Sequence, residues 1–433
     1  MPDPGITDRS APALRTNAPS AARAWAVVAM ITLLMAINFA EKSVLGLAAD
    51  PIMKELHLDA SEFGLLASSF YLLFSLSAVL VGFLANRVRA KWILGILAVA
   101  WSLTALPVFL AGSLAMLFAS RITLGAAEGP TAPVAVHAVH KWFPDRRRAM
   151  PTAVTQAGAV LGTVIAVPVL SWFILHHGWR SAWLVLAASC LVWAAGWLVV
   201  GQEGPLTDQA GPAADAAPDA PRYRPVLLSG SWLGMLVCAF GVYWAVAANL
   251  AWVPTYLTKA GGYDPATAGR LAALPSALGT LAMLVLPWLS GRWMRRGATS
   301  RCARGIPAGL LAIVSGCCLL AVSAVPAGPL RLVLLSLAFG LPVAGVPLMY
   351  LVNAEISPVR LRGATSGLCV GIVTFGGMFA PVALGRQLDA AATPAAGYQA
   401  GFALTAALLI VGGIVAVIAV NPERDARRTG TRT

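Results

Sequence analysis

Charge is scarce in this sequence. Of its 433 residues only 11% are charged, whereas 58% are apolar, and the mean hydropathy is +0.76. A soluble domain carries about 25% charged residues, so this composition excludes an ordinary water-soluble chain and predicts one that lies mostly in lipid. The formal net charge is +13. No basic stripe is interleaved with aromatic residues, which argues against a nucleic-acid partner.

Cysteine and histidine patterns that build a chemical site are also lacking. The six cysteines have neither disulfide nor metal-binding spacing. His137 and His140 lie three apart near the end of an apolar stretch, but no acid or cysteine completes a site with them. Residues 1–23 are polar and rich in Pro and Ala, so no cleavable signal peptide is visible, and we expect the first apolar stretch to be an uncleaved anchor. The sequence therefore predicts no enzyme and no bound cofactor or metal.

Long apolar runs dominate the chain instead. A helix of about 20 apolar residues crosses the ~30 Å hydrocarbon core of a bilayer. Such runs lie near residues 25–49, 63–85, 92–111, 114–138, 149–175, 181–201, 229–257, 271–290, 305–325, 331–353, 363–385 and 400–420. The sequence therefore predicts an all-α membrane protein with twelve transmembrane helices.

The polar segments indicate domain organisation and orientation. We expect an N-terminal tail at 1–24, a six-helix bundle at 25–201, a linker at 202–228, a second six-helix bundle at 229–420 and a C-terminal tail at 421–433. The linker is rich in Ala, Pro and Asp, which cannot bury a core. Most of the 31 Lys and Arg residues fall in alternate segments. By the positive-inside rule, this predicts a multi-pass inner-membrane protein with both termini and the linker in the cytoplasm.

Short basic loops recur at matching places in the two halves. Residues 82–91 follow the second apolar run as 287–296 follow the eighth, and residues 144–149 follow the fourth as 358–363 follow the tenth. Taken singly, each loop is most simply a topology determinant. Their recurrence on one membrane side predicts two pseudo-symmetric six-helix bundles, as in transporters whose halves rock against each other.

Two segments carry a family resemblance. The loop with Gly82, Asn86, Arg87 and Lys91 resembles the loop 2–3 motif of major facilitator transporters, with Asn86 where an Asp is usual. Residues 121–130, followed by 142–144, resemble the helix 4 signature of the anion:cation symporter branch. The resemblance spans about residues 25–422. It implies the major facilitator fold, a monomer, and transport of organic anions that is usually driven by protons. It also implies that the four named loop residues control the change of conformation.

Four charged residues, Glu41, Lys42, Arg121 and Glu128, fall within the apolar runs. A charge near a helix centre costs ~2.5–3.5 kcal/mol, and these four formal charges cancel, which predicts a compensated cluster facing an internal cavity. Neighbouring helical positions point ~100° apart, so Glu41 and Lys42 each need a partner elsewhere. Arg121 and Glu128 share one helix face but lie ~10.5 Å apart, too far for an ion pair. Helix direction places Glu41, Lys42 and Arg121 in one layer and Glu128 below it. Alternatively, Glu41 and Lys42 extend to the outer interface, and Arg121 is purely structural.

The resemblance implies a role for each charge. Arg121 would hold the substrate carboxylate, which suits a guanidinium that makes two parallel hydrogen bonds. Glu128 would carry the coupling proton and Glu41 would be a second protonatable site, while Lys42 stands where an Arg is usual. Phe74 aligns with a cavity Tyr of the branch, so we expect a binding hydroxyl to be missing. The predicted substrate-binding residues are Arg121, Lys42, Gln156, Asn249, Phe74 and Tyr243.

These features together predict a proton-coupled secondary transporter that imports a small organic anion by alternating access. The few polar side chains favour a rather apolar anion, such as an aromatic or short-chain carboxylate, although each is singly more simply a contact between helices. The identity of the anion and the choice between proton and sodium stay open. An alternative is proton-driven drug or metabolite efflux, but the Gly-Pro motif of that branch is absent from residues 158–164, where the proline is displaced to Pro168.

Overall fold

The computed structural model describes residues 21–84, 88–110, 113–143, 149–205, 223–358 and 361–431. In this part of the chain, ten helical stretches are long and apolar enough to cross a membrane. In the first half they are α1 (Ala21–Leu47), α5 (Ala90–Leu110), α8 (Ala149–Leu161) continued by η2 (Gly162–Ala166) and α9 (Val167–His177), and α10 (Arg180–Val200). In the second half they are α12 (Gly230–Lys259), α13 (Pro265–Arg295), η4 (Arg301–Gly305) with α14 (Ile306–Ala324), α15 (Pro329–Gly340) with η5 (Leu341–Ala344) and α16 (Gly345–Ile356), α17 (Arg362–Ala390) and α18 (Pro394–Ala419).

The two remaining predicted spans are each formed by a pair of shorter helices. The predicted span 63–85 corresponds to α3 (Ala60–Ser69) and α4 (Tyr71–Leu84), and the predicted span 114–138 to α6 (Leu114–Glu128) and α7 (Thr131–His140). The second pair is interrupted at Gly129 and Pro130, where proline cannot donate a helical hydrogen bond. Three short helices complete the structure: α2 (Ala49–Leu56), α11 (Arg224–Leu227) and α19 (Pro422–Arg428).

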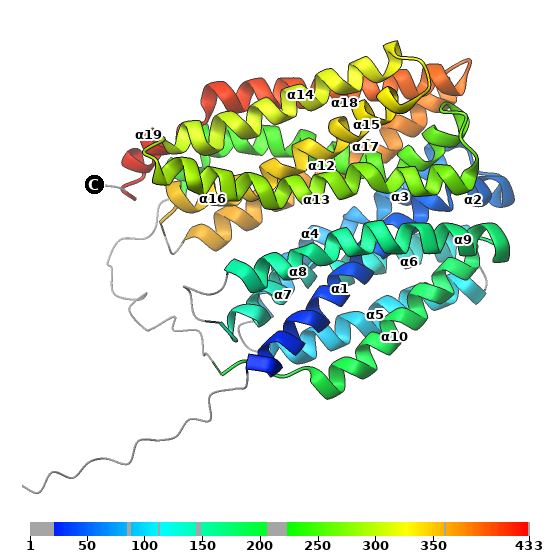
Figure 1. The fold of residues 1–433 in the computed structure, drawn as a ribbon, viewed down its shortest axis with the longest axis horizontal. Coiled ribbons are helices and arrows are strands. Elements are labelled where there is room, and N and C mark those ends of the chain that lie inside the picture. Colours follow the sequence, from blue (N-terminus) through cyan, green and yellow to red (C-terminus); the bar gives the residue numbers. More distant parts are fainter. Residues whose placement is uncertain are drawn as a thin grey trace, which may run out of the picture.

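The helices gather into two bundles, which lie on opposite sides of the molecule in Figure 1. Helices α1 to α10 form the N-terminal half, and α12 to α19 form the C-terminal half. Within the C-terminal half, α12 packs against α17 and α18, and α14 against α18; within the N-terminal half, α5 packs against α10. Backbone polar groups have no water to bond in lipid, so a continuous helix is the way each span satisfies them. We call the two ends of the bundles the α2 end and the α19 end. The sequence predicts that the α19 end faces the cytoplasm.

Polar contacts join the two halves at the α2 end. The carboxylate of Asp389, at the end of α17, accepts hydrogen bonds from the backbone N–H groups of Ala60 (2.9 Å) and Ser61 (2.7 Å) at the start of α3. Asp50 on α2 pairs with the Lys259 ammonium at 3.0 Å and accepts from the Thr258 hydroxyl at 3.1 Å, both at the end of α12. These contacts close the α2 end of the interface between the halves.

Two glycines permit close backbone contacts around the centre of the molecule. A β-carbon at Gly46 of α1 would lie 1.8 Å from the carbonyl oxygen of Leu250 on α12, across the two halves. A β-carbon at Gly125 of α6 would lie 1.8 Å from the carbonyl oxygen of Phe70, between α3 and α4. Only glycine allows these approaches, which bring α1 against α12 and α6 against the α3–α4 pair.

At the α19 end, a carboxylate that follows the last membrane-spanning helix of each half binds the start of the third span. In the N-terminal half, Glu203 accepts from the backbone N–H groups of Ala90 (3.4 Å) and Lys91 (3.3 Å) and pairs with the Lys141 ammonium at 2.6 Å. In the C-terminal half, Glu423 of α19 accepts from the backbone N–H groups of Ser300 and Arg301. Helix N-termini favour such negative groups, so the same kind of carboxylate contact stabilises each half.

Helix α19 lies in the segment for which the sequence analysis predicted only a tail. Asn421 caps it, and Pro422 occupies its first turn, both common helix-start signals. The buried Asp425 carboxylate accepts from the backbone N–H of Ser231 at 2.8 Å, at the start of α12. The tail is therefore bound to the C-terminal half.

Candidate functional site

The intramembrane charges gather inside the N-terminal half on α1 and α6. Glu41, Arg121 and Glu128 are 1%, 3% and 2% exposed, and Lys42 is half-buried. Their sequence neighbours are apolar, so these side chains need polar partners across the helices. The burial of Glu41 excludes the alternative that this acid extends to the outer interface.

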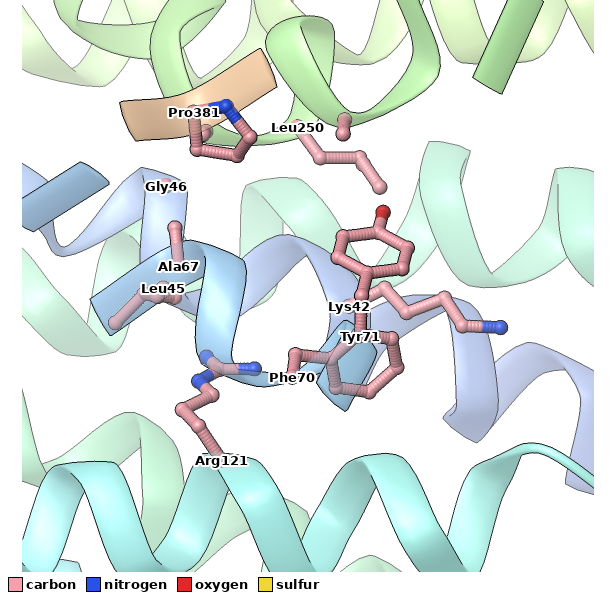
Figure 2. A pocket seen from close by; sticks show the side chains of 11 residues that line it. Lys42, Leu45, Gly46, Ala67, Phe70, Tyr71, Arg121, Leu250 and Pro381 are labelled. Carbon is pink, nitrogen blue, oxygen red and sulfur yellow. The ribbon is translucent and has the colours of Figure 1, made fainter. Parts of the chain in front are cut away.

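Among the described residues, Lys42 forms the one ion pair within this group. Its ammonium lies 3.2 Å from a Glu128 carboxylate oxygen and donates to the Asn38 side-chain carbonyl at 2.7 Å. Side chains on a helix point toward its N-terminus, so the Lys42 stem extends one turn back along α1 and reaches the level of Glu128. The predicted layer of Glu41, Lys42 and Arg121 is therefore wrong for Lys42. Figure 2 shows its ammonium pointing away from Arg121.

The Arg121 guanidinium is only partly satisfied. One terminal nitrogen, Nη1, donates to the backbone carbonyl of Glu41 at 3.4 Å, and the guanidinium carbon lies 5.9 Å from the centre of the Trp183 ring, a cation–π distance. The other nitrogen, Nη2, is buried and has no hydrogen-bond partner among the described residues. A buried donor without a partner costs ~1–3 kcal/mol, more when it is charged. The site therefore holds an unused cationic donor, which suits an anionic group.

Glu41 points away from Lys42 into the N-terminal bundle. One of its carboxylate oxygens lies 3.8 Å from the sulfur of Cys190, at the middle of α10, and the cysteine thiol donates to it. A carboxylate buried beside a weak thiol donor has little compensation for a negative charge. Among the described residues, the Cys190 thiol is the one side-chain donor that bonds the Glu41 carboxylate.

A small cavity between the halves joins these groups. Its volume is about 30 Å³, and its wall includes Lys42, Arg121, Phe70 and Tyr71 from the N-terminal half and Leu250 and Pro381 from the C-terminal half. Figure 2 shows Arg121 extending from α6 toward it and the Tyr71 hydroxyl pointing to Leu250. Since one water needs roughly 10–15 Å³ of such space, the cavity holds about two waters. An organic molecule fits only when the halves move apart.

Tyr71 is the cavity residue that sequence reasoning missed. Alignment on Gly82 pointed to Phe74, from which a missing hydroxyl was inferred. Tyr71 lies one turn earlier on the same face of α4, and its phenol lines the cavity. The Phe74 ring instead lies 5.7 Å from the Lys42 ammonium and packs against Phe70. The helical spacing of positions 71 and 74 was the signal that could have found the hydroxyl.

The other predicted site residues are more scattered. Asn249 lines a second cavity between the halves. Tyr243 packs against the apolar core, and Gln156 is half-buried on α8; neither lines these two cavities. Among the four loop residues, Gly82 lies in the last turn of α4, and Asn86 and Arg87 lie outside the described residues. Lys91 begins α5 and donates to the Leu198 carbonyl at 3.2 Å.

The comparisons with known proteins decide the family. The sequence model of the Major Facilitator Superfamily matches residues 31–381. The chain belongs to this superfamily. The predicted all-helical membrane fold is thereby confirmed, and this superfamily member is a multi-pass membrane transporter rather than an enzyme. A bacterial homologue of the human lysosomal transporter Spinster, solved in an inward-facing and unoccupied conformation, shares the fold with a TM-score of 0.74 and 18% identity, over 95% of this chain and 98% of that one.

Two relatives of this superfamily member match it over nearly their whole length. A "Probable sulfoacetate transporter" of Cupriavidus necator is 28% identical over 92% of this chain and 93% of its own length. A "Hexuronate transporter" of Bacillus subtilis is 25% identical over 92% of this chain and 94% of its own length. Both names describe carriers of organic acids, in agreement with the resemblance to the anion:cation symporter branch.

Proposed function

We propose that this chain is a proton-coupled secondary transporter of the inner membrane that imports a small organic anion by alternating access. The observation that carries the proposal is the buried Arg121 guanidinium, whose Nη2 has no partner among the described residues and which lines a cavity between the two halves. A carboxylate or sulfonate would supply the missing acceptor through a charge-assisted hydrogen bond. The relatives named for sulfoacetate and hexuronate transport support an organic acid as the substrate.

The charge count of the site supports coupling to one proton. Glu41 and Glu128 balance Lys42 and Arg121, so the empty site is formally neutral. Bringing an anion into this low-dielectric space without compensation is costly. One proton on Glu128 or Glu41 would give the site a charge of +1, which a monoanion then cancels. The site with the anion bound is then neutral, and its access can change from one side of the membrane to the other.

The Lys42–Glu128 pair suggests how the proton and the anion are linked. With Glu128 ionised, its carboxylate holds the Lys42 ammonium at 3.2 Å. Protonation of Glu128 releases that ammonium, which also lines the cavity and can then help Arg121 hold the anion. Because the anion and the Glu128 carboxylate compete for one cation, binding of the anion favours uptake of the proton, and the reverse also holds.

Closure of the α2 end suggests which state the structure represents. Asp389 and Asp50 join the halves there, and the cavity has no space for an organic acid. If the α19 end faces the cytoplasm, as the Lys and Arg distribution predicts, the path to the outside is shut. Separation of the α2-end contacts would open the Arg121 side of the cavity to the outside for loading.

Uptake into proteoliposomes tests the proposal. The purified full chain is reconstituted, and accumulation of labelled carboxylates and sulfonates is measured with and without an inward proton gradient. We expect gradient-driven accumulation of a small acid that is lost in Arg121→Ala and retained in Arg270→Ala, which removes an exposed arginine of α13. Absence of accumulation for every acid, together with export of cationic dyes, would contradict the proposal and favour efflux.

A further inference from the structure

A second cavity between the halves presents uncharged oxygen atoms. Its volume is about 10 Å³, close to the space of one water. Its polar wall consists of Ser43 on α1, Thr163 on η2, Asn249 on α12 and Ser276 on α13, so both halves contribute. Leu250 lines this cavity and the Arg121 cavity, which shows that the two adjoin. Lys42 and Ser43 are neighbours on α1, and they line the Arg121 cavity and the second cavity, respectively.

An unpaired amide oxygen lies in the wall of this second cavity. Asn249 is 7% exposed; its side-chain nitrogen donates to the Ser276 hydroxyl at 3.1 Å, and its side-chain oxygen has no partner among the described residues. A buried amide oxygen without a partner is costly. The expected compensation is a hydrogen-bond donor that is not part of the protein.

Two hydroxyl groups of the wall are also left as acceptors. Ser43 donates its hydroxyl hydrogen to the Phe39 carbonyl at 2.8 Å, and Thr163 donates its own to the Ala159 carbonyl at 2.9 Å. Each hydroxyl oxygen retains lone pairs that can accept a bond. Together with the Asn249 oxygen they form three acceptors, and the Ser276 hydroxyl, which accepts from Asn249, keeps its own hydrogen as a single donor. This set suits a hydroxyl group, which both donates and accepts.

The chemistry of the wall narrows that donor to a neutral one. Among the residues that the structure describes, neither a carboxylate nor a basic side chain lines the second cavity. An ammonium would be buried without an opposite charge, and a carboxylate without a cation, which are both costly. A hydroxyl O–H needs only the acceptors that are present. Thr163 also lies in a π-helical turn, a distortion of helices that is frequent at functional sites.

We propose that the second cavity is a hydroxyl subsite, so that the chain selects short hydroxy acids that carry one acidic group bound at Arg121 and a hydroxyl bound at Asn249. This inference rests on the proposed function, because it needs the acid to bind at Arg121. It excludes as preferred substrates the diacids, whose second anionic group would meet the acceptors of the subsite. Because Leu250 borders both cavities, we expect a short carbon chain to join the two groups.

Four matched four-carbon probes test the subsite: butyrate, 4-hydroxybutyrate, succinate and 4-aminobutyrate. They place a methyl, a hydroxyl, a carboxylate and an ammonium at the end away from the shared carboxylate. Binding to the purified full chain is measured by calorimetry and by the shift in melting temperature. We expect 4-hydroxybutyrate to bind about tenfold more tightly than butyrate, the gain from one buried hydrogen bond, and succinate to bind no better than butyrate.

Two variants at one position keep the test independent of folding. Asn249→Leu should remove the advantage of 4-hydroxybutyrate and leave the affinity for butyrate unchanged. Asn249→Asp, which has nearly the same shape, should shift the preference toward 4-aminobutyrate because it supplies a negative charge. Equal weakening of butyrate and 4-hydroxybutyrate in Asn249→Leu, or tighter binding of succinate, would overturn the subsite.

The outcomes also separate the subsite from the proposed function. Binding of all probes through Arg121, with no effect of the terminal group, overturns the subsite alone. Binding of none of them to the wild-type chain overturns the subsite, whereas the organic-anion proposal falls only if the proteoliposome panel also shows no accumulation of any acid.

Discussion

Asp389 accepts hydrogen bonds from both the backbone N–H and the hydroxyl of Ser61, at 2.7 Å and 2.5 Å, and so joins the end of α17 to the start of α3 across the two halves. Within the N-terminal half, Asp59 and Glu62 already form a capping box at this helix start. The free N–H groups that remain are bound by a carboxylate from the opposite half. The first turn of α3 is thus part of the contact that closes the α2 end.

Asp389→Ala should favour opening of the α2 end. Loss of a helix-capping carboxylate costs ~1 kcal/mol, so we expect an about fivefold shift toward the open state. A cysteine placed at Ala67, in the cavity wall, should then react faster with a membrane-impermeant thiol reagent applied from the α2 side, in a background without the native cysteines.

Asp264→Ala is the matched control for that experiment. Asp264 also caps a helix, because it accepts from the Thr267 N–H at 3.0 Å, but it lies within the C-terminal half. The thiol reaction should be unchanged in this variant. Equal acceleration in both variants would attribute the effect to general loosening instead of the contact between halves.

Replacement of the two members of the Lys42–Glu128 pair should have different effects. Glu128→Gln should abolish uptake driven by a proton gradient and leave counterflow exchange, because the neutral amide releases Lys42 permanently. Lys42→Met should weaken anion affinity and lower stability, since it leaves a buried carboxylate without its cation. Uptake, counterflow and melting temperature together check this expectation.

The double variant of this pair gives the sharper readout. Lys42→Met combined with Glu128→Gln removes both charges, so its stability should exceed that of Lys42→Met alone. Additive losses in the double variant would show that the two side chains do not act as a pair. Loss of counterflow in Glu128→Gln would assign Glu128 a structural role.

Gly125→Ala should disrupt the site without touching a charge. The added methyl group would meet the Phe70 carbonyl, so α6 must move away from the α3–α4 pair and carry Arg121 and Glu128 with it. Overpacking of this kind costs ~1–3 kcal/mol or more. A lower melting temperature together with weaker anion binding is expected.

Gly367→Ala is the control for helix glycines. Beyond its two chain neighbours and the nearby backbone of α17 itself, no atom of the described residues lies within 4 Å of a β-carbon at Gly367. This substitution should leave the melting temperature at or above that of the wild type. A comparable loss in both variants would contradict the role of the close approach at Gly125.

The Glu203 contact should depend on pH. Partial burial acts to raise the pKa of Glu203, but the Lys141 ammonium and the N–H groups of Lys91 and Ala90 outweigh it and hold the pKa below its ordinary value of 4.5. A lowered pKa in the folded state stabilises the fold above pH 4.5, and this contribution is lost as the pH falls through the lowered value. The wild type should therefore melt above Glu203→Gln at neutral pH, and the difference should vanish in strong acid. A difference that does not change with pH would rule out this ionic contact as its cause.

The sequence predicted the helices better than the contacts of the charged residues. Apolar length defines a span irrespective of its neighbours, which is why ten stretches agree closely with the predicted runs. The break at Gly129 and Pro130 was not predicted, because apolar length does not report a local loss of helical bonds. Helix α19 was missed although Asn421 and Pro422 form a helix start, since its few polar residues gave no apolar signal.

Composition predicted which charged residues form the site, but residue spacing did not predict all of their contacts. Buried charges must be compensated, so Glu41, Lys42, Arg121 and Glu128 could be identified as a group. Their pairing depends on the tilt and rotation of α1 against α6, which no residue spacing encodes, and Lys42 consequently reached Glu128 instead of the predicted layer. The Asn249 side chain likewise lines a cavity that residues of both halves form, and the sequence alone does not show that these residues meet.

The carboxylates of Glu203 and Glu423 make each half a module that fastens its own last helix to its own third span. Neither fastening borrows a residue from the other half. Each half is therefore held together at this end by its own residues alone among those described. A chain divided between residues 206 and 222 should assemble from its two fragments.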